Sequence, residues 1–284
     1  MATYAVTGSA SGMGAAAVAQ LRADGHTVIT VDIKDADVVA DLSSVDGRAH
    51  AAEQVLTACA GRLDGALMAA GLGPGKGADR LRLIATVNHL GVVDLLQRWR
   101  PALAVAQHAK VVVVGSNSTT TTPGVPGRAV RALLAGDVDG AVRSTRLYGP
   151  GRPAMVYAAS KIAVTRWARR TAVLPEWAGA GIRLNVLAPG AVLTPLLQEQ
   201  LADKRQGKLV ERFPVPVGGY GEPGLLARWM CFMLSDAADF SCGSVVFVDG
   251  GTDALFRGDD WPRPYPLRRV VRYLRRYRGR SRPA

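Results

Sequence analysis

A phenol and an ammonium stand four residues apart at Tyr157 and Lys161, in the segment Tyr157-Ala158-Ala159-Ser160-Lys161. On a helix this spacing places both side chains on one face. An unperturbed tyrosine, with a pKa of about 10, is a poor base at neutral pH unless a nearby cation favours the phenolate. Lys161 could supply that field. The same spacing is common on ordinary amphipathic helices, so the pair indicates chemistry only together with other signals.

A glycine-rich turn follows the first strand-like run, at Thr7-Gly8-Ser9-Ala10-Ser11-Gly12-Met13-Gly14. Glycines let the backbone turn sharply and approach a pyrophosphate, which the first N–H groups of the next helix can bind. The spacing is GxxxGxG and differs from the GxGxxG fingerprint of dinucleotide-binding turns. Taken alone, the turn is equally consistent with a strand-to-helix connection that holds no ligand.

An acidic residue, Asp32, ends the apolar run Val28-Ile29-Thr30-Val31 about 20 residues past the glycines. A carboxylate at this place can accept hydrogen bonds from both hydroxyls of an adenosine ribose, and it repels the 2′-phosphate of NADP. The sequence therefore favours NAD. Two alternatives stay open: Asp32 is also consistent with a residue that only caps a turn, and the neighbouring Lys34 leaves room for the phosphorylated cofactor.

Short β-branched runs alternate with longer Ala- and Leu-rich segments, which is typical of βαβ units around a parallel sheet. We predict an α/β, doubly wound, Rossmann-like fold with a seven-stranded parallel sheet in a single domain. The expected strands are Thr3–Thr7, Thr27–Asp32, Val38–Asp41, Asp64–Ala69, Val111–Ser116, Ile182–Leu187 and Val245–Val248. The expected helices are Gly14–Asp24, Gly47–Ala60, Asp79–Gln107, Ala154–Trp177 and Pro223–Leu234.

Two segments interrupt the alternation. The first is an insertion at about 117–151, in which apolar spacing predicts two short helices separated by Gly136-Asp137. We expect it to pack as a flap beside the main fold. The second is a basic C-terminal tail at 257–284, so the predicted domain covers residues 1–256. In the tail, apolar residues from Leu267 to Tyr277 recur at helical spacing among arginines.

The formal net charge of +12 is concentrated in that tail. It holds ten arginines against Asp259 and Asp260, a local excess of eight, which leaves +4 for the rest of the chain. A solvated, partly disordered end is the plainest interpretation of the tail, because isolated helices of this length are marginal in water. Weak contact with an anionic membrane comes next. Nucleic acid is disfavoured because the rest of the chain is only mildly basic.

No signal peptide precedes the first strand, and no apolar run approaches the roughly 20 residues of a spanning helix. We therefore expect a cytoplasmic protein. The three cysteines Cys59, Cys231 and Cys242 lack CxxC spacing, so we expect free thiols and no metal site.

Together these features resemble the short-chain dehydrogenase/reductase family, whose members carry TGxxxGxG at the first turn, an acid after the second strand and a Ser…YxxxK catalytic set. The match covers about residues 3–253. Further family-like motifs stand in order along the chain: Asp41-Leu42, Val87-Asn88-His89-Leu90-Gly91, Ser116 after a valine run, Asn185 through Pro189-Gly190, and Asp249-Gly250-Gly251.

The resemblance implies a catalytic role for four residues. Tyr157 would be the general acid and base, and Ser116 would hydrogen-bond the substrate oxygen. Lys161 would hold the nicotinamide ribose and lower the tyrosine pKa, while Asn88 would anchor a water-linked proton path from Lys161. Read singly, Ser116 is also consistent with a strand-end turn residue and Asn88 with a polar group inside a helix.

The same resemblance implies that NAD is bound. Backbone near Pro189–Val192 and the hydroxyl of Thr194 would contact the nicotinamide carboxamide, although Thr194 is equally consistent with a helix cap ahead of Pro195. The expected cofactor-binding residues are Gly8, Ser11, Gly12, Met13, Asp32, Asp41, Leu42, Gly71, Tyr157, Lys161, Val192 and Thr194.

The chain departs from the family pattern in two places. It has Met68-Ala69-Ala70-Gly71 where the family has Asn-Asn-Ala-Gly, which we interpret as a subfamily trait that affects support of the sheet. Ser116 and Tyr157 are 41 residues apart, far more than is usual. This insertion, together with Asp35-Ala36-Asp37-Val38-Val39-Ala40-Asp41-Leu42-Ser43 and Ala70-Gly71-Leu72-Gly73-Pro74, resembles the bacterial 3α-hydroxysteroid dehydrogenase/carbonyl reductase branch. That likeness implies a small-molecule substrate, a hydroxysteroid or another bulky apolar ketone or secondary alcohol, covered by a mobile lid at Leu193–Arg212. It also implies a homo-oligomer, and the insertion favours a dimer over a tetramer.

Three functions compete on the sequence alone. The first is NAD(H)-dependent hydride transfer between nicotinamide and a secondary alcohol or ketone. The second is a catalytically silent NAD(H)-binding regulatory or scaffold protein with a basic membrane-associating tail. The complete Ser116, Tyr157 and Lys161 set argues against it, because binding alone needs no such set. The third, a membrane or nucleic-acid binder driven by the tail, is compatible with the enzyme.

Overall fold

The strands form where short apolar runs can be buried on both faces. The chain, described here by a computed structural model at residues 1–75, 77, 79–202, 206–261 and 264–278, contains one seven-stranded sheet with the order β3-β2-β1-β4-β5-β6-β7. Every neighbouring pair in this sheet is parallel, so the predicted fold class is confirmed. The strands are β1 (Thr3–Thr7), β2 (Thr27–Asp32), β3 (Val38–Val39), β4 (Gly65–Met68), β5 (Lys110–Val114), β6 (Arg183–Pro189) and β7 (Val245–Val248).

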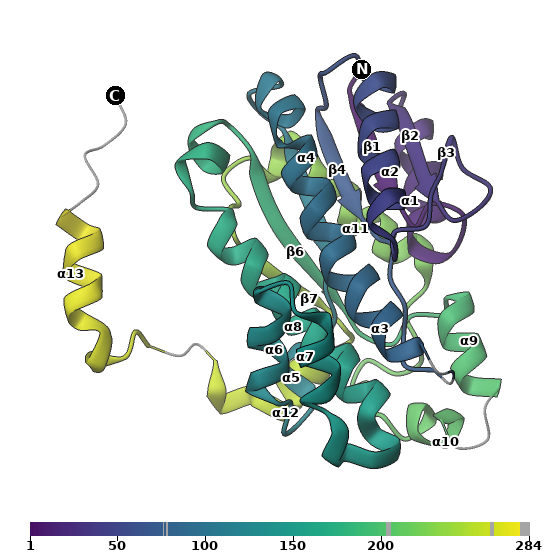
Figure 1. Cartoon of the computed structure of the whole chain (residues 1–284), viewed down its shortest axis with the longest axis vertical. Helices are drawn as coiled ribbons and strands as arrows, with labels where there is room; N and C mark the ends of the chain where they lie inside the picture. The colour runs from purple at the N-terminus through teal and green to yellow at the C-terminus, as the bar shows by residue number, and fades with distance from the viewer. Residues whose placement is uncertain (76, 78, 203–205, 262–263, 279–284) are drawn as a thin grey trace.

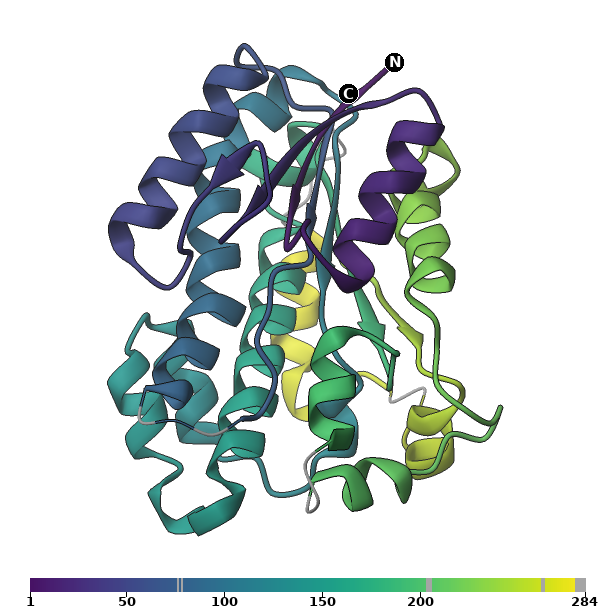
Figure 2. The same cartoon turned by 90° about the vertical axis from the view of Figure 1, so that its right-hand side faces the viewer.

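Helices cover both faces of the sheet. Figure 2 shows α1 (Gly12–Ala23) and α11 (Pro223–Leu234) on one side, and α2 (Val45–Ala58), α4 (Gly91–Val105) and α8 (Arg152–Thr171) on the other. Because successive strand residues point to opposite faces, β5 supplies Val111 and Val113 to the core under α2, α4 and α8, and Val112 and Val114 to the core under α1 and α11.

The strand order reverses at β1, which pairs with β2 on one side and β4 on the other. In open α/β sheets the crevice outside the carboxyl ends of strands at such a switch point is where ligands bind. Here the crevice lies between the turn after β1 and the segment after β4.

Two predicted helices differ from the observed ones. The expected helix Asp79–Gln107 is divided into α3 (Arg80–Ala85), a π-helical turn (Thr86–Leu90) and α4. The turn carries Asn88, and single π turns within helices are frequent at functional sites. The expected helix Ala154–Trp177 runs instead from Arg152 to Thr171, and a separate π-helical turn (Pro175–Gly179) follows. Pro175 lacks the N–H that would continue the first helix.

The insertion packs on the main fold through a core of its own. It contains α5 (Ser118–Thr121), α6 (Gly127–Leu134), α7 (Val138–Arg143) and a 3-10 turn (Arg146–Gly151). Asp137 caps α7 by accepting a hydrogen bond from the Gly140 N–H at 2.7 Å. Val130, Leu133 and Ala141 pack against residues of α3 and α8, so the two helices predicted around Gly136-Asp137 lie beside the helix that carries Tyr157.

The remaining elements follow β6 and β7. They are α9 (Pro195–Ala202), α10 (Gln206–Glu211), a 3-10 turn (Asp236–Ala238), α12 (Thr252–Arg257), 3-10 turns at Gly258–Asp260 and Leu267–Arg269, and α13 (Val270–Arg278). Figure 1 shows α13 standing apart from the sheet and its covering helices. Among the described residues, no helix has the length and apolar character needed to span a bilayer.

Candidate active site

Three side chains meet where β5 ends beside α8. Ser116 lies just past β5, while Tyr157 and Lys161 lie on one face of α8, four residues apart. The Ser116 and Tyr157 side chains line the same cavity, and Ser116 acts to lower the pKa of the phenol. The Lys161 ammonium donates to the carbonyl oxygen of Val114, the last residue of β5, at 2.8 Å. The strand end and the helix thus fix the catalytic set that the sequence predicts.

Burial dominates the titration of this set. It raises the pKa of Tyr157, and Ser116 opposes this only in part. Burial also lowers the pKa of Lys161 to about 8. The family resemblance implies a lowered tyrosine pKa, so the protein groups alone shift the tyrosine in the opposite direction. An added positive charge near the phenol would favour the phenolate.

Backbone contacts orient the Ser116 hydroxyl. Its Oγ accepts a hydrogen bond from the Ser118 N–H at 3.1 Å, and the Thr119 hydroxyl donates to the Ser116 carbonyl at 2.9 Å. Because the oxygen of the hydroxyl already accepts from the backbone, its proton is available to an acceptor in the cavity. Ser116 is placed to donate to the phenol or to a substrate oxygen.

Asn88 joins two parts of the site. Its side-chain amide donates to the Leu72 carbonyl at 2.9 Å, and its oxygen accepts from the Leu72 N–H at 2.8 Å. The amide also donates to Ser160 Oγ at 3.2 Å, and Ser160 in turn donates to the Tyr157 carbonyl at 2.7 Å. Both amide protons are thus used to hold the segment after β4 against α8. This contact pattern makes Asn88 a positioning residue in the described structure.

Gly71 allows the close approach of these groups. A Cβ atom at this position would lie 3.2 Å from Asn88 Oδ1 and 3.5 Å from Lys161 Nζ. A side chain there would occupy the space beside the two catalytic candidates. The departure from the family pattern at Met68-Ala69-Ala70 leaves this glycine and its role unchanged.

The glycine-rich turn has the geometry of a dinucleotide cradle. Gly8 has a positive φ of 68°, and a Cβ there would meet the Ala70 nitrogen at 2.6 Å. A Cβ at Gly14 would lie 2.0 Å from the Gly8 carbonyl oxygen. The side chain of Ser11, at the start of α1, makes no capping hydrogen bond. The first N–H groups of α1 therefore face the cradle without a side-chain acceptor, as phosphate binding requires.

A cavity of about 570 Å³ extends from this turn to the ends of β2 and β3. Asp32 lies at its wall, where its carboxylate accepts hydrogen bonds from the Ala10 N–H at 2.9 Å and the Ile33 N–H at 2.7 Å. The Asp41 carboxylate is held by the N–H and hydroxyl of Ser43 at 2.8 and 2.9 Å. The predicted cofactor residues that line the cavity are Gly8, Ser11, Gly12, Met13, Asp32, Asp41, Leu42, Gly71 and Thr194. These residues fit a dinucleotide.

A second cavity of about 400 Å³ holds the catalytic set and shares Met13, Gly71 and Thr194 with the first. Val192 lines it, and the Thr194 hydroxyl donates to the Val192 carbonyl at 3.3 Å and accepts from the Leu197 N–H at 3.4 Å. Thr194 therefore acts as a helix cap and also faces the cavities. Further apolar lining comes from Leu72, Pro74, Leu196, Leu197, Val210 and Phe213, and polar lining from Ser118, Thr121, Thr122 and Gln200.

One link to the substrate cavity escaped the sequence analysis. Asn117, next to Ser116, donates to Asp249 Oδ2 at 3.4 Å, and that oxygen also accepts from the Asp253 N–H at 2.7 Å. The Thr252 hydroxyl donates to the Pro214 carbonyl at 2.9 Å, next to the cavity residue Phe213. From the sequence, the Asp249-Gly250-Gly251 motif is recognisable only as a family-like feature. Its contacts show that it anchors the cavity wall to the segment that carries Ser116.

Comparison with known proteins agrees with this geometry. The family described as "Enoyl-(Acyl carrier protein) reductase" matches residues 140–253. The 3-alpha-hydroxysteroid dehydrogenase/carbonyl reductase of Comamonas testosteroni is 37% identical over 90% of this chain and 98% of its own length. The chain belongs to the short-chain dehydrogenase/reductase family of oxidoreductases, as the sequence predicts.

Two further relatives mark its neighbourhood. The structure of the 3-alpha-hydroxysteroid dehydrogenase from Pseudomonas sp. B-0831 complexed with NADH aligns with a TM-score of 0.84 at 45% identity, covering 90% of this chain and 99% of that one. The levodione reductase of Leifsonia aquatica is 30% identical over 88% of this chain and 94% of its own length. The predicted resemblance to the hydroxysteroid dehydrogenase branch is therefore confirmed.

Proposed function

We propose that this chain is an NAD(H)-dependent oxidoreductase that transfers a hydride between nicotinamide and a secondary alcohol or ketone. The observation that carries the proposal is that Ser116, Tyr157 and Lys161 line one cavity that adjoins the dinucleotide cradle. The NADH complex of the Pseudomonas relative supports the choice of cofactor. So does Asp32, whose carboxylate lines the cradle and would repel a 2′-phosphate.

NAD, when bound, supplies the hydride acceptor at its nicotinamide ring. The chain supplies the proton chemistry: Tyr157 removes the hydroxyl proton of the alcohol, or returns it to the oxygen in the reverse direction. Ser116 donates a hydrogen bond to the same oxygen. Lys161 holds the cofactor ribose and provides positive charge near the phenol, while Asn88 keeps α8 and the Leu72 backbone in place.

We propose a hydroxysteroid or another bulky apolar carbonyl compound as substrate. The apolar lining of the catalytic cavity, from Leu72, Leu196, Leu197 and Phe213, suits such a molecule. The names of the Comamonas and Pseudomonas relatives support the same class. Since NAD(H) is an intracellular cofactor, the cytoplasm stays the expected location.

A reduction screen tests this function. Purified protein is mixed with NAD⁺ or NADP⁺ and either a 3α-hydroxysteroid or a small secondary alcohol, and formation of reduced nicotinamide is followed by absorbance. We expect turnover with NAD⁺ and the steroid to exceed turnover with every other pairing. Tight NADH binding without turnover on any alcohol or ketone would instead favour the silent regulatory or scaffold protein.

We also propose that the enzyme is a homodimer. The α11 side chains Leu225, Trp229 and Phe232 are exposed, and β7, at the end of the sheet order, has a strand on one side only among the described residues. An exposed aromatic helix face and an unpaired strand edge both suit contact with a second copy of the chain. The insertion covers part of α8 and would hinder a further interface there. Light scattering should show a dimer, and a tetramer as the sole species would refute this arrangement.

A further inference from the structure

The segment Leu267–Arg278, called the tail helix below, exposes apolar side chains that nothing in the described chain covers. It consists of the 3-10 turn Leu267–Arg269 followed directly by α13. Leu267 is 87% exposed, Val271 63% and Tyr277 75%. Figure 1 shows α13 set apart from the sheet and from the helices that cover it. The helix therefore forms without burying its apolar side chains in the fold.

The tail helix separates apolar and basic residues onto two faces. At about 100° per residue, an arc of about 160° holds only apolar or aromatic positions: Leu267, Val270, Val271, Tyr273, Leu274 and Tyr277, all of them exposed. An opposite arc of about 120° holds five arginines by sequence, at 268, 269, 272, 275 and 276. Arg278 at the end is the exception. Such a division is typical of helices that lie in a membrane interface.

Charge selects the kind of surface. Between Trp261 and Ala284 the sequence has no acidic residue, so no carboxylate lies within this stretch of the sequence to balance its arginines. A stretch with this excess of positive charge attracts an anionic surface. Lipid satisfies both faces, because the headgroups meet the arginines and the acyl boundary receives the apolar arc. Nucleic acid would meet the charge and leave Leu267, Val271 and Leu274 in water.

The tyrosines strengthen the case for a lipid interface. Tyr265, Tyr273 and Tyr277 form a row, with ring centroids 5.6 Å apart for the first pair and 6.1 Å for the second. Tyr273 marks the edge of the apolar arc next to the arginines. Tyrosine is suited to that boundary because its ring is apolar and its hydroxyl can remain in the polar headgroup region.

We propose that the tail helix docks the enzyme on an anionic lipid surface. Pro264 and Pro266 precede the tail helix. Proline-rich segments form stiff, extended connectors. The connection can therefore hold the catalytic body near the surface. This docking has a use that rests on the proposed function: bulky apolar alcohols and ketones partition into lipid, so a surface-bound enzyme meets its substrate at higher local concentration.

Sedimentation with vesicles tests the docking on the full chain. We compare vesicles of phosphatidylcholine alone with vesicles that also contain phosphatidylglycerol, at low and high salt. The tail variant replaces Arg268, Arg269, Arg272 and Arg275 with Gln, and a matched control replaces the exposed arginines 128, 131, 146 and 166 of the body. We expect binding only to the anionic vesicles, weakened at least about tenfold by salt or by the tail variant. The control variant should bind like the original chain.

A second variant separates lipid from nucleic acid. Replacing Val270, Val271 and Leu274 with Ser removes apolar contact and keeps every arginine, so we expect it to weaken vesicle binding as well. Undiminished vesicle binding by this variant, together with displacement of the chain from vesicles by a single-stranded oligonucleotide, would overturn the lipid proposal in favour of nucleic acid. Equal binding by the tail variant and the control would also overturn it.

Turnover measured without vesicles tests the proposed enzyme activity independently of lipid binding. None of the tail substitutions touches the catalytic cavity, so NAD⁺ reduction should be unchanged in every variant. Vesicle binding by a chain that reduces no NAD⁺ would support docking and contradict the proposed chemistry.

Discussion

Two buried lysines stand at opposite ends of the same strand and do different things. Lys110 is the first residue of β5, and Lys161 donates to the carbonyl of Val114, the last. Their exposed fractions are 4% and 5%. Burying an ammonium is costly unless it is paired, so the partners of each lysine show how the fold uses it.

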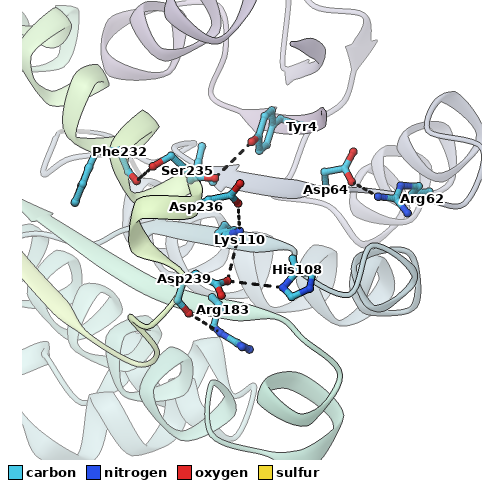
Figure 3. Close-up of polar contacts among 11 residues, drawn as sticks. Tyr4, Arg62, Asp64, His108, Lys110, Arg183, Phe232, Ser235, Asp236 and Asp239 are labelled. Carbon is cyan, nitrogen blue, oxygen red and sulfur yellow. Dashed lines mark hydrogen bonds and ion pairs between the residues drawn. The ribbon is translucent and has the colours of Figure 1, made fainter. Parts of the chain in front are cut away.

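At the amino end of β5 the charge is neutralised. The Lys110 ammonium lies 2.6 Å from Asp236 and 3.5 Å from Asp239, and Figure 3 shows these contacts with the hydrogen bond from Arg183 to the Asp239 carbonyl. The group joins β5 and β6 to the 3-10 turn Asp236–Ala238, on the way to β7. Lys110 lowers the pKa of Asp236. This end of the strand serves to hold elements together.

At the carboxyl end the charge is left without a carboxylate. Among the described residues, the ion pairs include none for Lys161, whose hydrogen bond goes to a neutral carbonyl. Burial accordingly lowers its pKa to about 8. Burying an ammonium group without a carboxylate destabilises the fold, and such a group beside a cavity is typical of a functional site. The same residue type is thus paired with carboxylates at one end of the strand and unpaired beside a cavity at the other, where we propose that it meets a ligand.

The largest loss of activity is expected at Tyr157, one turn of α8 away from Lys161. Tyr157→Phe removes the proton-transfer group and keeps the ring, so kcat should fall by about 10²–10⁴-fold while NAD⁺ affinity stays within a few-fold. Steady-state kinetics and cofactor titration measure the two effects. Near-normal turnover in this variant would remove Tyr157 from the mechanism.

Lys161→Met should separate activity from stability. Turnover should fall by about 10²-fold, whereas the free energy of unfolding at pH 7 should stay equal or rise because an unpaired buried charge is removed. A lysine whose pKa falls on folding binds fewer protons in the folded state, so the original chain should gain stability as pH rises from about 8 toward 10.5. The variant should lack this gain. A marked loss of stability at pH 7 would show that Lys161 is structural.

The sequence was sufficient to predict the sheet and to select Ser116, Tyr157 and Lys161 as residues that lie together, because both follow from local patterns. Runs of β-branched residues locate β1, β2 and β7 with the observed bounds, and the Tyr157 and Lys161 pair is four residues apart. Chain topology then brings Ser116 to them, since the end of β5 lies beside α8. Local spacing could not show the π turn at Asn88, which depends on hydrogen bonds to Leu72 and Ser160.

The ion pairs of Lys110 with Asp236 and Asp239 could not be predicted from the sequence for a related reason. Its partner Asp236 is 126 residues away, and a lysine at the start of an apolar strand looks like a solvated strand end. Only the placement of the turn after α11 shows that the side chain is buried. The rise in the Tyr157 pKa was missed for the same reason, because burial depends on the whole packed site.

A third effect is expected at Asp32, a carboxylate at the carboxyl end of β2 that lines the proposed cofactor cavity. Asp32→Ala removes hydrogen bonds to the adenosine ribose and the repulsion of a 2′-phosphate. The ratio of kcat/KM with NAD⁺ to that with NADP⁺ should therefore fall by about tenfold, which matches the loss of one hydrogen bond to a charged group. An unchanged ratio would place the adenosine ribose elsewhere.

The smallest effect is expected at the amino end of β5. The double variant Asp236→Asn with Asp239→Asn leaves Lys110 buried without a counter-ion. We expect a stability loss of about 1–2 kcal/mol, kept low because Asp236 is solvent-exposed. Because the pKa of Asp236 is lowered in the fold, its contribution is present above about pH 4 and lost as pH falls further.

Denaturant unfolding measures that loss, with Asp259→Asn and Asp260→Asn as the matched control. Turnover per folded molecule should be unchanged in both pairs of variants. A fall in kcat for the Asp236 and Asp239 variant alone would show that the two ends of β5 are coupled. This would contradict a purely structural role for the ion pairs at its amino end.

We propose above all that a hydride passes between an alcohol carbon and nicotinamide when both are bound in this cavity. The direct measurement uses a 3α-hydroxysteroid deuterated at the carbinol carbon, with NAD⁺ and the purified chain, and locates the label in the products by NMR. We predict deuterium at C4 of the reduced nicotinamide, on one face, together with formation of the ketone. Ketone formation with unlabelled reduced cofactor, or cofactor binding with no ketone at all, would contradict the account.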